Sequence, residues 1–148
     1  MNLKRVLNKE VISADLKGET KEEIIDSLVA LLFNAGKVKD AAKVKQCILE
    51  RESKMTTGME AGIAIPHGKT DAVDELVGCI GIKKGGVDFK ALDGKPSNIF
   101  VMTVSPLNKT GPHVQFLAEI SRLLREESQR ARLLEAESSE EIFSIFCG

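Results

Sequence analysis

The sequence predicts an α/β fold in which a single mixed β-sheet is flanked by helices on both faces. Short apolar runs typical of buried strands alternate with amphipathic segments of helical period along most of the chain. Between Leu76 and Val104, however, apolar runs follow one another with only turn residues between them, which indicates that the strands are not all parallel. The chain has 148 residues, an ordinary length for one core, so we expect residues 1–148 to form a single domain.

Composition is typical of folded globular proteins and argues against several classes of partner. Hydrophobic residues make up 43% and charged residues 29% of the sequence, and the net charge is −1, so we expect no nucleic acid partner. Tryptophan and tyrosine, the usual platforms for stacked bases, are absent. No apolar run approaches the length of a membrane span and no signal peptide is expected, so we expect no membrane insertion. The three cysteines form no Cys-x-x-Cys pair, which favours reduced thiols in a cytoplasmic protein.

The first part of the chain predicts one strand followed by two helices. Residues 11–14 form an apolar run bounded by turn residues, as strands do. Thr20 and Glu23 match a capping box ahead of apolar residues at helical spacing, and the helix should end at the Asn-Ala-Gly sequence of residues 34–36. A second helix is expected over about residues 40–53, capped by the aspartate at its start.

The remainder of the chain predicts further strands and then a helical C-terminal third. Pro112 suits the first turn of a helix whose apolar face extends to Leu124, and residues 126–134 continue or restart that helix. Ser138 and Glu141 match a second capping box before a last short helix. Apolar runs predict strands, and clusters of glycine, proline or aspartate predict turns. The expected strands are residues 63–65, 76–82 and 99–104, and the expected turns are residues 83–86 and 92–96.

The most distinctive stretch of the sequence surrounds His67. Gly58 and Gly62 permit backbone conformations and close approaches that other residues resist. Residues 63–65 form an apolar run short enough for a buried strand, and Pro66 has no N–H, so the ladder of the sheet should end there. His67 is therefore expected just beyond a strand end, where α/β folds bind ligands. Its imidazole can act there as a nucleophile, a base or a metal ligand.

The chain has two histidines, His67 and His113, and each follows a proline at the end of an expected element. Several interpretations are open from placement alone. They can be surface histidines at loop edges, or ligands of a zinc site that lacks a third ligand with supporting spacing. A Cys–His nucleophile pair would need a cysteine at a comparable strand end. Phosphoryl transfer through histidine itself is the remaining interpretation, because neutral imidazole attacks phosphorus and forms a covalent intermediate.

Phosphoryl transfer would need positive charge and hydrogen-bond donors around the negative oxygens of the transferred group. The sequence offers Arg51, His113, the hydroxyl of Thr57, and the backbone amides of the loop from Gly58 to Gly62. Arg51 also has a simpler interpretation. A basic side chain in the last turn of a helix complements the helix dipole without any contact to a ligand.

The run from residue 51 to residue 69 contains Gly-Ile-Ala-Ile-Pro-His and resembles the signature of enzyme IIA domains of the mannitol/fructose type in the phosphotransferase system. This type-2 EIIA family includes nitrogen-regulatory relatives. Residues 87–96 and 112–124 are also similar to the family, so the resemblance covers nearly the whole chain in the right order. It implies the mannitol-type enzyme IIA fold, a mixed sheet flanked by helices.

The resemblance implies that His67 accepts a phosphoryl group from the phosphocarrier protein HPr and passes it to a IIB component. It also implies that His113 and Arg51 support the phosphoryl group, and that neither a metal nor a dissociable cofactor is required. We expect Thr57 and Gly58 to be further phosphoryl-binding residues. The leading hypothesis is a phosphocarrier for uptake of a fructose- or mannitol-type sugar.

The alternative is a nitrogen-type regulatory enzyme IIA, whose phosphorylation state controls partner proteins. Both types share the Pro-His-Gly site, so the site does not separate them. Glu60 and Ala61 stand where a Gly-Asn pair is familiar in the regulatory type, which favours sugar transport slightly and adds a carboxylate near an anion site. A hydrolase that uses His67 as a base is a more distant hypothesis, and it would turn over without a protein donor.

Overall fold

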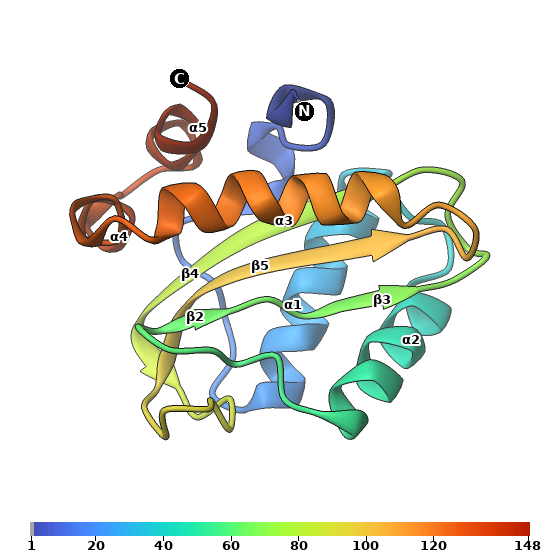
Figure 1. The fold of residues 1–148 in the computed structure, drawn as a ribbon, viewed down its shortest axis with the longest axis horizontal. Coiled ribbons are helices and arrows are strands. Elements are labelled where there is room, and N and C mark those ends of the chain that lie inside the picture. The colour runs from blue at the N-terminus through green and yellow to red at the C-terminus, as the bar shows by residue number, and fades with distance from the viewer. Residues whose placement is uncertain (1) are drawn as a thin grey trace.

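Two long strands form the centre of a five-stranded sheet in the computed structural model, which describes residues 2–148. β4 (Val77–Val87) and β5 (Ser97–Ser105) run antiparallel to each other. β5 is buried at every position except Asn98, because helices cover both faces of the sheet (Figure 1). The sheet order is β1-β4-β5-β2, and the outer strands run parallel to their neighbours, so the predicted mixed sheet is confirmed.

The outer strands are short. β1 (Ile12–Ser13) pairs with β4, whereas β2 (Ile63–Ala64) and β3 (His67–Lys69) pair in turn with β5 on its other side. The sequence predicted that the ladder ends at Pro66, but it resumes with His67. Pro66 cannot donate a hydrogen bond, yet its carbonyl still accepts one from the amide of Thr103 at 3.1 Å. His67 therefore begins a strand, and the register sets it directly beside Thr103 of β5.

Helices cover the two faces as the amphipathic patterns indicated. α3 (Gly111–Leu124) crosses one face, and α1 (Lys21–Asn34) and α2 (Ala41–Lys54) lie behind the other (Figure 1). α4 (Glu127–Glu135) and α5 (Ser139–Cys147) complete the chain, with α5 beside the N-terminal 3-10 turns Leu3–Arg5 and Lys9–Val11. No helix among residues 2–148 has both the length and the apolar character to span a bilayer.

The predicted helix caps are confirmed, whereas one predicted turn is wrong. The side chains of Thr20, Asp40 and Ser138 each accept a hydrogen bond from an amide in the first turn of the helix that follows. Residues 83–86 do not turn the chain, because β4 continues through them to Val87. The register shifts between Ile82 and Val87, so the extra residues form an irregular, bulged segment of the strand rather than a loop.

α2 packs tightly against β3 through a glycine. A Cβ atom added to Gly68 would lie 2.7 Å from Sγ of Cys47 and 3.0 Å from the backbone oxygen of that residue. Cys47 lies on α2, so only glycine lets the helix come this close to the strand that carries His67. The Pro-His-Gly sequence thus combines an interrupted edge strand, an imidazole and a helix contact.

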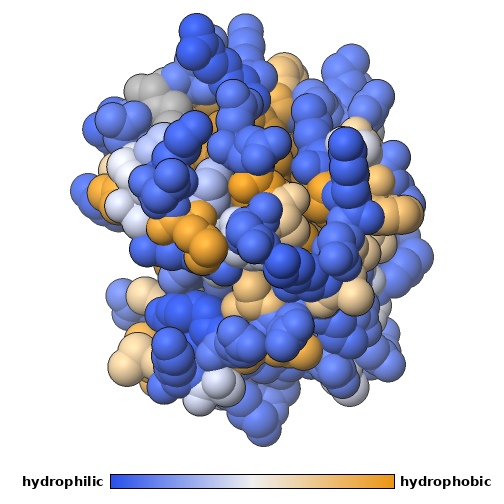
Figure 2. All heavy atoms as spheres, turned by 90° about the vertical axis from the view of Figure 1, so that its right-hand side faces the viewer, coloured by the Kyte–Doolittle hydropathy of each residue, from blue (hydrophilic) through white to orange (hydrophobic). Residues whose placement is uncertain are grey.

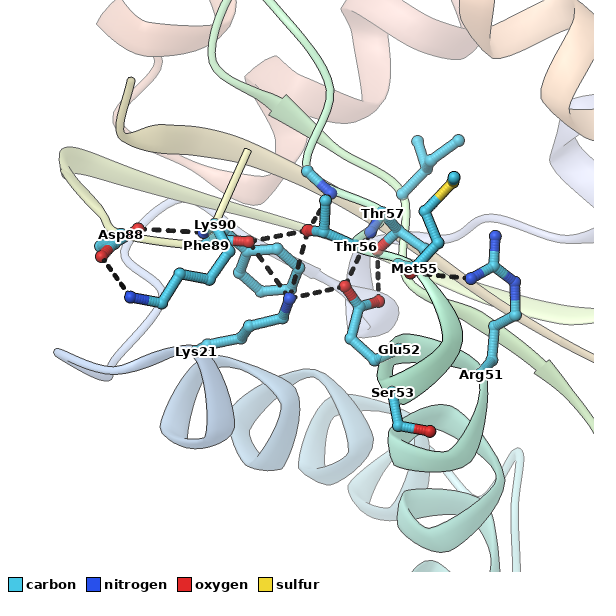
Figure 3. Close-up of polar contacts among 12 residues, drawn as sticks. Lys21, Arg51, Glu52, Ser53, Met55, Thr56, Thr57, Asp88, Phe89 and Lys90 are labelled. Atoms are coloured by element: carbon cyan, nitrogen blue, oxygen red, sulfur yellow. Dashed lines mark hydrogen bonds and ion pairs between the residues drawn. The ribbon is translucent and has the colours of Figure 1, made fainter. Parts of the chain in front are cut away.

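A buried carboxylate joins α1, α2 and the loop before β2. The carboxylate of Glu52 accepts hydrogen bonds from the amide of Thr57 at 2.7 Å and from the hydroxyl of Thr57 at 2.5 Å. Lys21 on α1 forms an ion pair with the same carboxylate at 2.8 Å, as Figure 3 shows. Because buried charges are stabilised only when they are paired and hydrogen-bonded, these contacts fix the loop onto the two helices.

Lys21 and a neighbouring threonine also bond to the segment after β4. Lys21 also donates to the backbone oxygen of Phe89 at 3.2 Å, and its ammonium lies 4.6 Å from the centroid of the Phe89 ring. The hydroxyl of Thr56 donates to that oxygen at 2.9 Å and accepts from the amide of Gly58 at 3.1 Å (Figure 3). We call Lys21, Glu52, Thr56 and Thr57 the Glu52 cluster.

We predict that Gly68→Ala lowers the free energy of unfolding by about 1–3 kcal/mol, because the new methyl group must push α2 away from β3. Urea unfolding followed by circular dichroism measures the change. Gly85→Ala is the matched control, since a Cβ atom at that glycine has no neighbour within 4 Å. Equal losses in the two variants would contradict the close contact.

We predict that Glu52→Gln lowers the free energy of unfolding by about 1–3 kcal/mol, because the amide offers a single acceptor oxygen to the donors of Thr57 and Lys21. The side chain of Lys21 is 24% exposed, so water can solvate its ammonium, which limits the loss. Glu50→Gln, an exposed change on the same helix, should shift stability by less than about 0.5 kcal/mol. A neutral Glu52→Gln result would show that the cluster does not hold the loop.

Candidate functional site

The fold brings the two histidines together. His67 begins β3 on the edge of the sheet, and His113 lies in the first turn of α3 on the face above it. The ring centroids are 5.0 Å apart, the ring planes are inclined by 36°, and both residues are half-buried. Elements distant in sequence therefore form one site, in which two imidazoles can contact the same small group.

Hydrogen bonding determines which nitrogen of His67 is free. Its Nδ1 lies 2.9 Å from the backbone oxygen of Ile65. A carbonyl oxygen can only accept a hydrogen bond, so Nδ1 carries the proton in the neutral ring. Nε2 then holds an unshared electron pair. This is the atom with which His67 can attack an electrophile.

His113 is held by β5. Its Nδ1 lies 2.9 Å from the hydroxyl oxygen of Thr103, the residue that pairs with His67 in the sheet. Burial, together with the nearby charges of His67 and Lys69, lowers the pKa of His113 to about 4. At neutral pH the ring is therefore uncharged. A neutral imidazole still has one N–H that it can donate to an anion.

Arg51 lies in the last turn of α2, the helix that packs on β3. Its guanidinium donates to the backbone oxygen of Met55 at 2.8 Å, and Figure 3 shows it on the other side of Glu52 from Lys21. This bond satisfies a carbonyl at the helix end, as basic residues often do. It uses one of the guanidinium donors, and the remaining donors make no other hydrogen bond in the described part of the chain.

The hydrogen-bond donors of Thr57 and Gly58 are already used by neighbouring side chains. Both donors of Thr57 bind the carboxylate of Glu52, and the residue is 2% exposed. The amide of Gly58 donates to Thr56, and a Cβ atom here would lie 2.9 Å from the Cα of Ala91. The phosphoryl-binding role expected of Thr57 and Gly58 therefore has no free donor at either residue in this conformation.

Two further amides of the loop donate hydrogen bonds. The amide of Met59 donates to the oxygen of Ile63 at 2.7 Å, and the amide of Ala61 donates to the carboxylate of Asp93 at 3.3 Å. Ala61 has a φ of 60°, in the left-handed region that glycine or asparagine adopts more readily. The unusual Glu60-Ala61 pair thus places a side chain at a strained backbone position, which Asp93 helps to hold.

Sequence reasoning missed two residues that organise the site, Thr103 and Glu52. The signal for Thr103 was its hydroxyl within the otherwise apolar run of residues 99–104. Glu52 gave no comparable signal, because a carboxylate near a helix end is ordinarily solvated. Its burial depends on Lys21 and Thr57, which are separated from one another in sequence.

The surface beside the site combines polar groups with exposed apolar side chains. Figure 2 shows the face onto which the first turn of α3 and the end of β3 open, with small hydrophobic patches among hydrophilic residues. Leu107 and Val114, which flank the start of α3 in sequence, are 62% and 63% exposed. Among residues 2–148 no group of three or more histidine, cysteine or acidic side chains is arranged to hold a metal ion.

Known proteins are similar to this chain along most of its length. Residues 5–147 match the family model described as "Phosphoenolpyruvate-dependent sugar phosphotransferase system, EIIA 2". The fructose-specific EIIA component of Haloferax volcanii is 40% identical over 136 residues, which are 92% of this chain and 88% of that protein. The fructose-specific EIIABC component of Bacillus subtilis is 39% identical over 145 residues, 98% of this chain, but the chain spans only 23% of the length of that relative.

Solved structures agree with these sequence matches. The crystal structure of the nitrogen regulatory protein IIA-Ntr from Neisseria meningitidis superposes with a TM-score of 0.88 at 29% identity, and covers 96% of this chain and 97% of its own. Mannitol enzyme IIA of Escherichia coli, in its complex with phosphorylated enzyme IIB, has a TM-score of 0.80 at 26% identity, over 95% of this chain and 96% of its own. Because the family model covers almost the entire sequence and the fold agrees, the chain belongs to the EIIA type-2 family of the sugar phosphotransferase system.

Proposed function

We propose that this protein is a phosphocarrier of the phosphotransferase system. In the cytoplasm, His67 accepts a phosphoryl group from phosphorylated HPr. It passes this group to a IIB component for the uptake of a fructose- or mannitol-type sugar. The observation that supports this role most directly is the proton arrangement of His67, whose Nδ1 is bonded to Ile65 and whose Nε2 has a free electron pair. Family membership and the fructose-specific relatives are consistent with it.

The transfer to His67 needs only two reacting groups, the phosphohistidine of the donor and the imidazole of His67. The Nε2 electron pair of His67 forms the new N–P bond while the N–P bond of the donor phosphohistidine breaks, and the donor ring recovers its electron pair. The His67 ring keeps its Nδ1 proton, and the bond to Ile65 stabilises the positive charge that develops on the ring. The second transfer, to a IIB component, is the same displacement with His67 as the leaving group.

The negative equatorial oxygens of the transferring group need donors around them, to the side of the line that joins the attacking and leaving nitrogens. His113, 5.0 Å from His67 between ring centroids, is one candidate and donates as a neutral ring. Arg51, on the helix packed behind β3, is the candidate for charge neutralisation through its remaining guanidinium donors. A protein donor must also dock beside the site, and the exposed side chains of Leu107 and Val114 offer it apolar contacts.

A second candidate function is nitrogen-type regulation, which the TM-score of 0.88 to IIA-Ntr favours. The two functions differ in the fate of the phosphoryl group once it is on His67. A carrier gives the phosphoryl group up rapidly to a fructose- or mannitol-type IIB protein, whereas a regulator retains it in the presence of IIB. Single-turnover transfer from the purified phosphoprotein to such a IIB protein therefore decides between them.

We predict that the chain gains one phosphoryl group when it is incubated with phosphoenolpyruvate, enzyme I and HPr, and that intact-mass measurement detects it. The adduct should be acid-labile, as a phosphoramidate is, and His67→Ala should abolish it. His113→Ala should still be labelled, about 100- to 1000-fold more slowly, because one charge-stabilising donor is lost. His113→Gln, which keeps a donor, should recover part of the rate. Labelling of His67→Ala at the wild-type rate would assign the nucleophile to another residue.

We predict that Arg51→Ala slows phosphoryl transfer to His67 while the fold is retained. If Arg51 served only the helix end, the change would cost at most about 1 kcal/mol of stability and leave transfer intact. Arg51→Lys should rescue transfer only in part, since an ammonium lacks the planar fork of donors. Lys54→Ala, in the same last turn of α2, is the matched control. Rates equal to wild type in Arg51→Ala would remove Arg51 from the mechanism.

A further inference from the structure

One residue of β5 touches both halves of the histidine pair. Thr103 is 1% exposed and lies opposite His67 in the parallel ladder. Its amide donates to the backbone oxygen of Pro66 at 3.1 Å, immediately before His67. Its hydroxyl oxygen lies 2.9 Å from Nδ1 of His113. Thr103 therefore fixes the strand that carries one ring and also contacts the other ring directly.

The direction of the bond between Thr103 and His113 follows from burial. The hydroxyl of Thr103 has no other hydrogen-bond partner among residues 2–148, so its proton can be satisfied only by Nδ1 of His113. If the ring donated instead, the hydroxyl proton would be left buried without an acceptor, at a cost of about 1–3 kcal/mol. The hydroxyl therefore donates, and Nδ1 accepts.

A neutral imidazole has one N–H, so an accepting Nδ1 requires the proton to be on Nε2. We propose that Thr103 is a positioning residue of the phosphoryl-transfer site, because its hydroxyl holds the His113 ring in the tautomer and orientation in which Nε2–H is available to the phosphoryl oxygens. This inference rests on the proposed function. The lowered pKa of His113 is consistent with it, since a protonated ring would have no acceptor for the hydroxyl.

The two rings then have opposite proton arrangements. His67 donates through Nδ1 to Ile65 and has a bare Nε2, whereas His113 accepts at Nδ1 from Thr103 and has a protonated Nε2. The first arrangement suits a nucleophile and the second suits a donor to negative charge. Each arrangement is set by a partner on the sheet side of the site, one a backbone carbonyl and the other a side-chain hydroxyl.

The test is a double-mutant cycle on transfer from phosphorylated HPr. Thr103→Val keeps the shape of the side chain and its strand preference but removes the hydroxyl, and we expect transfer to slow by about 10- to 100-fold through loss of donor alignment. Thr103→Ser should restore most of the rate. In a His113→Ala background, Thr103→Val should have no further effect, because the ring that it positions is gone. An equal loss in both backgrounds would overturn the proposal.

The matched control is Ser97→Ala, at the start of β5, since that buried hydroxyl has no hydrogen-bond partner within the described residues. It should transfer at the wild-type rate. Nitrogen NMR of the unphosphorylated protein tests the bond without any transfer reaction. We expect the wild-type His113 ring to show a protonated Nε2 and an unprotonated, hydrogen-bonded Nδ1, and the Nδ1 signal to shift in Thr103→Val. A protonated Nδ1 would overturn the proposal even if transfer proceeds, and absence of all transfer with this NMR signature intact would refute the phosphocarrier function instead.

Discussion

The hydrogen bonds and the ion pair of the Glu52 carboxylate hold together the part of the structure that surrounds the candidate site. The carboxylate is buried, and its bonds to Lys21 and Thr57 connect α1, α2 and the loop before β2. A buried carboxylate without these donors would be strongly destabilising, so the contacts favour the arrangement in which all three elements are packed together. Arg51 is the preceding residue of the same helix, and its guanidinium is held separately, by the backbone oxygen of Met55.

From this anchor the site is assembled by close approaches to the sheet. Gly68 lets α2 touch β3. The amide of Thr103 donates to Pro66, just before β3, and its hydroxyl contacts His113 of α3. Groups that stabilise a developing charge act best when they need no reorganisation during the reaction. A site built on a buried central strand, beside a loop bonded to Glu52 and Asp93, meets that requirement better than one built on mobile segments.

Local signals predicted the fold well, and long-range contacts explain what they missed. The caps Thr20, Asp40 and Ser138 depend on neighbouring amides, so sequence alone located them. The extent of β4 depends on its pairing with β5 at Ile82 and again at Val87, so residues 83–86 bulge between these two pairs and do not reverse the chain. The motif singled out His67 and His113 and suggested Thr57 as a donor. The hydroxyl of Thr57 is instead committed to a carboxylate whose burial requires Lys21, and no local pattern reveals such a partnership.

The short outer strands have a consequence for association between sheets. Exposed strand edges are templates for pairing with another chain, and proteins protect them with short strands, proline and lysine. Here one edge is the two residues of β1. The hydroxyl of Ser139 on α5 donates a hydrogen bond to the backbone oxygen of Ile12 at 2.8 Å. The other is split by Pro66 into two fragments and ends at the exposed Lys69. The proline that precedes His67 thus also interrupts the ladder on this side of the sheet, and the segment from Thr57 to Met59 bonds along β2, so this side offers another chain at most the three residues of β3.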